Sequence, residues 1–197
     1  MGEIGIILLA AGSSSRMGQS KQLLLVEGEP LLLRSAKAAL ASGADSVVVV
    51  LGANEKLHEK TIQNLGVTIV YNRYWLKGLG NSLKAGLSHV LKFAPETEAV
   101  IVMVCDQPRL TGEHLKNLIQ QYTATKNKIV ASSYSKTVGV PALFDKSLFQ
   151  NLLEGEDEQG ARKVLNNHLD STCTVGFDGG EIDLDTLSDY KTFIKKH

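Results

Sequence analysis

The sequence has few cysteines, no excess of charge and no long apolar segment, and each absence excludes a class of protein. Cys105 and Cys173 are far apart and lack metal-ligand spacing, so neither a disulfide framework nor a cysteine metal site is expected. The 21 Lys and Arg residues balance 21 Asp and Glu residues, which argues against a broad basic surface for nucleic acid. We therefore expect reduced thiols, no nucleic-acid partner and, by default, a cytoplasmic location.

Membrane attachment and secretion are not expected either. The apolar run after Met1-Gly2-Glu3 is too short to cross a membrane, and no basic segment precedes it as in a signal peptide. The five histidines show no metal-ligand spacing. No internal repeat, low-complexity tract or long linker interrupts the 197 residues, so we expect one domain spanning residues 1–197.

What the sequence does contain is a regular alternation of apolar runs and amphipathic segments. The apolar runs are rich in Val, Ile and Leu, which is typical of strands covered on both faces. Strands are predicted at Ile4–Ala10, Ser46–Leu51, Val67–Tyr71, Ala99–Cys105, Lys128–Ser133 and Thr174–Phe177. Helices are predicted at Leu31–Ala41, Glu55–Asn64, Asn81–Phe93, Thr111–Thr125, Lys146–Leu153, Gly160–Leu169 and Ser188–Lys195.

This alternation predicts an α/β fold, a three-layer α/β/α sandwich with a mostly parallel, Rossmann-like sheet. The segment Ser132–Phe144 is the weakest part of the pattern. There, short strands are expected to form an antiparallel edge.

The most informative stretch follows the first predicted strand and reads Leu9-Ala10-Ala11-Gly12-Ser13-Ser14-Ser15-Arg16-Met17-Gly18-Gln19-Ser20-Lys21. Its small residues let backbone amides approach an anion, and its two cations add a rigid guanidinium and a mobile point charge. Ligands of open α/β sheets bind beyond the carboxyl ends of the strands, where this stretch lies. We therefore predict that it binds a triphosphate.

The stretch differs from the two common glycine-rich motifs. A Walker A loop would need Gly where Met17 stands and a Ser or Thr after Lys21, and a dinucleotide-binding loop would need Gly in place of Ser14. The second predicted strand also ends at Leu51-Gly52-Ala53, without the acidic residue that dinucleotide-binding folds use. These differences exclude a Rossmann dehydrogenase.

A carboxylate, Asp106, follows the predicted strand Ala99–Cys105, and Pro108 stops that strand. Such a residue suits Mg²⁺, which takes one or two carboxylates together with substrate phosphates, although capping of the next turn is the alternative. Asp183 is a candidate second Mg²⁺ ligand. For Asp185 no ligand is predicted, and we expect it only to cap or brace the last helix.

Two other segments leave a structural and a functional interpretation open. Gly78 and Gly80 flank a turn before Asn81-Ser82, which either cap a helix or bind a base or phosphate. The segment Gly139-Val140-Pro141-Ala142-Leu143-Phe144 is either a loop that lines an acceptor pocket or an edge strand that carries a proline.

Taken in order, these elements resemble the molybdenum cofactor nucleotidyltransferases. The cytidylyltransferase branch is nearest, and the enzymes that make molybdopterin-guanine dinucleotide are related. The resemblance spans nearly the whole chain. It rests on Leu9–Lys21, Asn72…Trp75…Gly78-Leu79-Gly80-Asn81-Ser82-Leu83, Cys105-Asp106-Gln107-Pro108, Gly139–Phe144, Gly155…Gly160-Ala161-Arg162 and Asp183-Leu184-Asp185-Thr186.

The resemblance implies a nucleotide-diphospho-sugar-transferase-like fold and a reaction. A nucleoside monophosphate, CMP in preference to GMP, would pass from an NTP to the phosphate of molybdopterin or molybdenum cofactor, with release of pyrophosphate. The nucleotide part would span about residues 1–110 and the acceptor part about residues 111–197. Molybdoenzyme maturation proteins are candidate transient partners.

The resemblance also implies residue roles. Catalysis would fall to Arg16, Lys21 and Asp106, with Mg²⁺ bound by Asp106 and Asp183. The implied nucleotide-binding residues are Leu9, Ala10, Ala11, Gly12, Ser13, Ser14, Gly52, Ala53, Gly80, Asn81 and Ser82. The implied acceptor-binding residues are Gln107, Pro108, Gly139, Pro141 and Arg162.

The acceptor and the nucleotide are left open at this point. Val140 stands where members of this family often have His or Asn, so a sugar phosphate or another phosphorylated metabolite is an alternative acceptor. No residue type decides between CTP and GTP. A non-catalytic nucleotide- or cofactor-binding protein is a second alternative, although pure binding would not need the Asp106 carboxylate.

Overall fold

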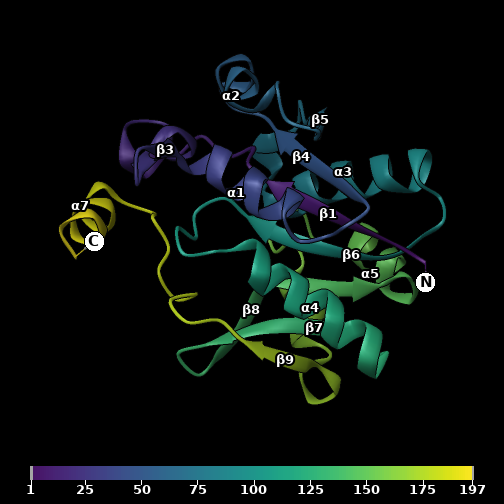
Figure 1. Ribbon diagram of the computed structural model, residues 1–197. Helices are drawn as coiled ribbons and strands as arrows, with labels where there is room; N and C mark the ends of the chain where they lie inside the picture. Colours follow the sequence, from purple (N-terminus) through teal and green to yellow (C-terminus); the bar gives the residue numbers. More distant parts are fainter. Residues whose placement is uncertain (1, 197) are drawn as a thin grey trace.

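A seven-stranded sheet runs through the centre of the computed structural model, which describes residues 2–196 (Figure 1). Across the sheet the strands are β5 (Thr68–Tyr71), β4 (Ser46–Leu51), β1 (Glu3–Leu9), β6 (Thr97–Val104), β8 (Thr137–Asp145), β7 (Ile129–Tyr134) and β9 (Cys173–Gly176). All pairs are parallel except those that β8 makes with β6 and β7. The mostly parallel sheet predicted from the sequence is confirmed.

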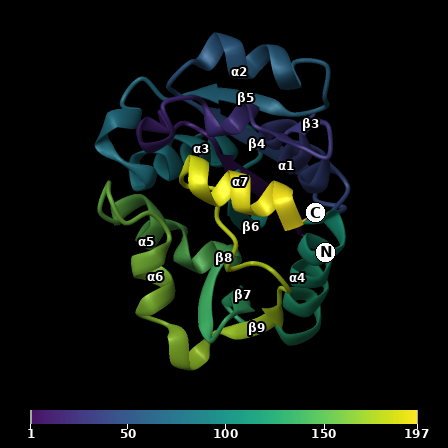
Figure 2. The ribbon, with the colours of Figure 1, turned by 90° about the vertical axis from the view of Figure 1, so that its left-hand side faces the viewer.

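Helices cover both faces of the sheet (Figure 2). One face carries α1 (Leu31–Leu40), α2 (Glu55–Ile62) and α4 (Gly112–Thr125), and the other carries α3 (Leu79–Phe93), α5 (Phe149–Glu154) and α6 (Arg162–Asn166). The last helix, α7 (Leu187–Lys196), packs apart from both layers. None of the helices that the structure describes is both long and apolar enough to cross a membrane.

The alternation of side chains along β1 explains why its sequence is apolar throughout. Ile6 and Leu8 belong to the core beneath α1 and α4, whereas Ile7 and Leu9 belong to the core beneath α3 and α5. All four are at most 4% exposed. A strand between two helical layers must be apolar on both faces, and this is the physical basis of the three-layer prediction.

The antiparallel segment lies inside the sheet, so the prediction of an antiparallel edge at 132–144 was wrong. β8 pairs with β6 on one side and with β7 on the other. The β7–β8 register shifts between Ala131 and Ser132, which pair with Ala142 and Gly139. The two residues of β8 between these pairs, Val140 and Pro141, form a bulge, and a proline without an N–H is tolerated there.

A small hairpin went unpredicted because its strands have only two residues each. β2 (Leu25–Val26) and β3 (Glu29–Pro30) are joined by Glu27 and Gly28, whose φ angles of 51° and 82° suit a two-residue turn. Val26 packs with Phe193 of α7 and with Leu184 in a small separate core. The hairpin therefore provides the surface against which the C-terminal segment packs.

Short 3₁₀ turns complete the chain: η1 (Ser15–Met17), η2 (Lys21–Leu23), η3 (Trp75–Lys77), η4 (Lys146–Leu148) and η5 (Leu169–Ser171). The predicted helix over 146–153 is split into η4 and α5, and the helix predicted over 160–169 is shortened to α6. The Asp145 side chain accepts a hydrogen bond from the Ser147 amide and so begins η4 as a separate turn.

Candidate functional site

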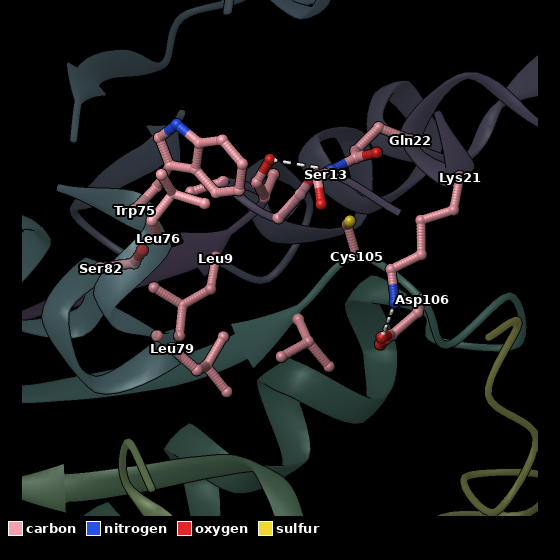
Figure 3. Close-up of a pocket in the computed structure, with 15 residues that line it drawn as sticks. Leu9, Ser13, Lys21, Gln22, Trp75, Leu76, Leu79, Ser82, Cys105 and Asp106 are labelled. Carbon is pink, nitrogen blue, oxygen red and sulfur yellow. Dashed lines mark hydrogen bonds and ion pairs between the residues drawn. The ribbon is translucent and has the colours of Figure 1, made fainter. Parts of the chain in front are cut away.

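A cavity of about 300 Å³ lies where the parallel strands β1 and β6 end (Figure 3). The loop after β1 forms one wall, and η3 with the start of α3 forms another. Because parallel strands bring their carboxyl ends to one edge of the sheet, Gly12 and Asp106 meet at this cavity although they are far apart in sequence.

The cavity brings together much of the predicted nucleotide site. Of the predicted residues, its lining includes Leu9, Ala10, Ala11, Gly12, Ser13, Lys21, Ser82 and Asp106. Others lie outside the lining: Ser14, Arg16, Gly52, Ala53, Gly80, Asn81 and Asp183. Gly52 is nevertheless adjacent, since a Cβ at this position would meet Trp75, which lines the cavity, and the carbonyl of Ala11.

The loop after β1 exposes its backbone toward the cavity. Gly12 and Ser13 are exposed. The Met17 side chain is 2% exposed and anchors the turn η1 to the protein interior. The Met17 amide donates to the carbonyl of Ser14, whose φ of 56° reverses the chain. The burial of Met17 therefore holds a glycine- and serine-rich segment open to solvent, as a phosphate loop requires.

Two cations and two carboxylates meet at the edge of the cavity. Lys21 Nζ lies 2.6 Å from Asp106 Oδ2 and 3.1 Å from Asp185 Oδ1, and Arg16 reaches the other oxygen of Asp185 at 3.1 Å. The Lys21 and Asp106 side chains are each 18% exposed, whereas that of Arg16 is 71% exposed. Burial alone would lower the pKa of Lys21, but the charge of Asp106 and its hydrogen bond outweigh burial and raise that pKa, so the lysine is charged.

The segment Asp183–Asp185 is attached to Asp106 through the backbone. The amide of Leu184, a fully buried residue, donates to the carbonyl of Asp106 at 3.0 Å. Asp183 keeps contact with solvent, and desolvation of its carboxyl together with the charges of Asp106 and Asp185 raises its pKa to about 6. A cluster of negative charge therefore surrounds Lys21.

Asp185 does not cap the last helix, so the prediction that it caps this helix was wrong, whereas the alternative that it braces the helix stays a prediction. The Asp189 side chain accepts from the Thr186 amide, and the Thr186 hydroxyl accepts from the Asp189 amide. This reciprocal pair caps α7. Asp185 is left free to bind Lys21 and Arg16.

The predicted metal ligands have a donor set that fits Mg²⁺. Asp106 Oδ1 is buried and has no hydrogen-bond partner within residues 2–196, so one carboxylate oxygen is available for a cation. Across the same residues no group of three or more His, Cys, Asp or Glu side chains is placed to hold a metal ion. Asp106 and Asp183 would thus need ligand oxygens from substrate, which is how Mg²⁺ is usually bound.

The neighbouring thiol does not contribute a reactive group. Cys105 lines the cavity but is 2% exposed, and burial together with the charge of Asp106 raises its pKa to about 12. The thiol is therefore protonated at neutral pH. Both cysteines are free in the structure, in line with the expected reduced state.

The first amides of α3 are already bonded within the protein. The carbonyl of Asp157 accepts from the amides of Gly80 and Asn81 at 2.7 and 3.2 Å. A Cβ at Gly80 would lie 2.2 Å from the carbonyl oxygen of Glu156, so glycine is required here by the 155–160 segment. Among the predicted residues of this turn, Ser82 faces the cavity, and its hydroxyl accepts a hydrogen bond from the buried side chain of Asn72.

The predicted acceptor residues lie outside the lining of the cavity. Gln107 is 3% exposed, and its side-chain nitrogen donates to the carbonyls of Val140 and Gly180. Pro108 and Pro141 are buried, Gly139 is half-buried and Arg162 is exposed. Gln107 therefore joins the β8 bulge to the loop before Asp183, and contact of these residues with an acceptor stays a prediction.

The family of the MobA-like NTP transferase domain matches residues 6–172 of the chain. The chain belongs to this family. The predicted resemblance to molybdenum cofactor nucleotidyltransferases and the predicted α/β fold are thereby confirmed.

Relatives of this MobA-like chain carry different names. The purine catabolism protein PucB of Bacillus subtilis is 27% identical, over 93% of this chain and 92% of its own length. The molybdenum cofactor cytidylyltransferase of Escherichia coli is 27% identical, over 98% of this chain and 96% of its own length. The structure of Rv0371c from Mycobacterium tuberculosis in complex with manganese has a TM-score of 0.81 at 22% identity, over 99% of this chain and 100% of its own.

Sequence reasoning missed three residues of the site in this MobA-like domain. Trp75 and Gln22 line the cavity, and Asp185 binds both cations. Gln22 gave no local signal, because a single polar residue before a leucine run is typical of an exposed position. Trp75 belongs to the motif Asn72…Trp75…Gly78 on which the resemblance rests. Its position opposite the phosphate loop comes from the pairing of distant strands.

Proposed function

We propose that this chain transfers CMP from CTP to the phosphate of molybdopterin or molybdenum cofactor and releases pyrophosphate. The observation that carries the proposal is the cavity that the phosphate loop lines, with Lys21 and Asp106 at its edge. The MobA-like family supports the use of an NTP. The preference for CTP and for a molybdopterin acceptor is supported by the similarity to the Escherichia coli molybdenum cofactor cytidylyltransferase over nearly its whole length.

In the proposed reaction, an oxygen of the acceptor phosphate attacks the α-phosphorus of CTP. A new P–O bond forms as the bond from that phosphorus to the oxygen of the β-phosphate breaks, and pyrophosphate leaves. Because the acceptor phosphate is already ionised, no general base is needed. Catalysis is then positioning plus stabilisation of charge that develops on phosphate oxygens.

The residues divide between these tasks. The exposed backbone of Gly12 and Ser13 binds the phosphates, Lys21 and Arg16 supply positive charge, and Ser82 lies near the nucleoside. Asp106 and Asp183 hold Mg²⁺, which when bound offsets the charge of the triphosphate. A divalent cation is supported by the buried, unpartnered oxygen of Asp106 and by the manganese complex of the similar mycobacterial protein.

The proposal also places the acceptor beyond Asp106. Gly139, Pro141 and Arg162 would then belong to an acceptor part at about 111–197, and Gln107 and Pro108 would contact the acceptor from the end of a nucleotide part at about 1–110. Tyr134 belongs to the same region, since its hydroxyl lies 3.3 Å from the carbonyl of Val140. The cytoplasmic location and transient contacts with molybdoenzyme maturation proteins stay predictions.

Release of pyrophosphate, measured with each NTP and each acceptor class, tests the proposal. We expect turnover with CTP and molybdopterin or molybdenum cofactor, and little with GTP, ATP or UTP. Turnover with a sugar phosphate instead would support nucleotidyl transfer but would show that the proposed acceptor is wrong. Binding of NTP without turnover on any acceptor would favour a non-catalytic nucleotide-binding protein.

A further inference from the structure

A buried glutamine lies directly beneath the phosphate loop. Gln22 is 1% exposed, and its side chain uses all of its hydrogen-bonding capacity. Its nitrogen donates to the carbonyls of Ala10 and Gly12 at 3.1 and 2.8 Å, and its oxygen accepts from the hydroxyls of Ser14 and Ser20 at 3.0 and 2.8 Å. One side chain therefore ties four points of the loop together.

These bonds decide which side of the loop backbone faces a ligand. Gln22 engages the carbonyls of Ala10 and Gly12, and the amide of Ala53 engages the carbonyl between them, that of Ala11, at 2.9 Å. Within the described part of the chain, no hydrogen bond uses the amide of Gly12 or of Ser13. Three successive carbonyls are thus occupied while the amides stay available, which is the arrangement that binds anions.

The same network is anchored in the protein interior. Ser20 Oγ lies 2.6 Å from Nε2 of His58, a residue of α2 that is fully buried. Because the one hydroxyl hydrogen of Ser20 goes to Gln22, the His58 ring must donate to Ser20. The Lys21 amide donates to the Ser14 hydroxyl, so the backbone of the catalytic lysine belongs to the same network.

We propose that Gln22 is a positioning residue for triphosphate binding, which turns the loop carbonyls away from the ligand and so presents the amides to it. It does not touch the reacting atoms and acts through the loop. The inference rests on the proposed function insofar as the ligand is an NTP. The loop itself requires only a phosphate anion.

Two substitutions of similar size separate the two halves of this role. Gln22→Glu keeps the acceptor side but loses the donors, so carboxylate oxygen would face two carbonyl oxygens. Gln22→Met removes both sides and leaves the carbonyls free to turn toward the ligand. Ser20→Ala removes the bond to Gln22 and the bond from His58, and it leaves the two carbonyl contacts of Gln22 in place.

The binding of CTP and, separately, of inorganic pyrophosphate is measured through the fluorescence of Trp75. Trp75 is the one tryptophan of the sequence and lines the same cavity. Each buried group left without a partner typically costs enough to weaken binding about tenfold to a hundredfold. We expect Kd for both ligands to rise by such a factor in Gln22→Glu and Gln22→Met, less in Ser20→Ala, with KM for the acceptor unchanged.

The control is Ile119→Val, a core substitution in α4 that lowers stability without touching the loop. It should lower Tm and leave both Kd values unchanged. If the Gln22 and Ser20 variants lower Tm but bind both ligands like the wild type, Gln22 is only structural and the inference is wrong. If the wild type binds pyrophosphate but no NTP, the proposed function fails while the pyrophosphate data still test Gln22.

Discussion

At the scale of single residues, Lys21 is surrounded by more negative charge than any local sequence pattern indicates. It lies between Asp106 and Asp185, with Asp183 close to both carboxylates. Its side chain is 18% exposed, so it is not a surface lysine. Its charge therefore pairs with carboxylates of the folded protein without any ligand.

We predict that Lys21→Ala lowers turnover about a hundredfold to a thousandfold, because one charge contact to the transition state is lost. It also removes the cation bound to Asp106 and one of the two bound to Asp185, so Tm should fall and should recover on addition of Mg²⁺ more than that of the wild type. Differential scanning fluorimetry with and without Mg²⁺ measures this. Lys146→Ala, which breaks an exposed pair with Glu98, is the matched control. A Lys21→Ala protein with normal turnover would contradict the role.

We predict that Asp106→Asn stays folded and loses the Mg²⁺-dependent part of the activity. The amide keeps the shape of the side chain but lacks the charge that a hard cation requires. Calorimetric titration with Mg²⁺ and CTP, compared with Asp170→Asn at an exposed position, provides the measurement. Unchanged metal dependence in Asp106→Asn would show that Asp106 does not bind the metal and would favour its alternative role as the cap of a turn.

The residues that carry the site differ in how far sequence could predict them. Asp106 and Gly12 follow apolar strands directly, so their positions at one edge of the sheet could be predicted. The partners of Asp185 could not, because they depend on how the chain returns to the loop after other elements have packed. The partners of Gln22 are close in sequence, but they depend on the exact fold of the loop. Asp185 meets Arg16 across 169 positions of sequence.

At the scale of elements, the strands between two helical layers were predictable because burial on both faces demands apolar runs. β8 was harder to place, since its bulge at Val140 and Pro141 interrupts the pairing and a proline suggests an edge. The start of α3 was open to two interpretations for a similar reason. Glycine at position 80 suits a ligand or a nearby backbone equally well, and the structure places the carbonyls of Glu156 and Asp157 there.

We predict that Gly80→Ala destabilises the protein by about 1–3 kcal/mol, because the added methyl group overlaps a backbone carbonyl. The segment 155–160 should then detach and become sensitive to a protease that cleaves after glutamate. Thermal unfolding and limited proteolysis measure both effects. Gly66→Ala, where a Cβ meets nothing within 4 Å, is the control. Wild-type stability and protease resistance in Gly80→Ala would show that this contact is dispensable.

At the scale of the whole molecule, the balanced charge leaves any attraction for an anion to local groups of cations. The chain has no net charge, so an anionic ligand gains little from the protein as a whole. The cations of the site instead come from the segment after β1, and their carboxylate partners come from the turn after β6 and from the segment before α7. The charged cluster at the cavity therefore combines segments from early and late in the sequence.

The most direct test of the account follows the α-phosphorus of CTP. The wild-type protein is incubated with Mg²⁺, molybdenum cofactor and CTP labelled at the α-phosphorus, and in parallel with CTP labelled at the γ-phosphorus. The account predicts that the α-label appears in a product that contains both cytidine and the cofactor, while the γ-label appears in pyrophosphate. An α-label that stays in CTP, or that passes only to a product without the cofactor, would contradict the proposed function.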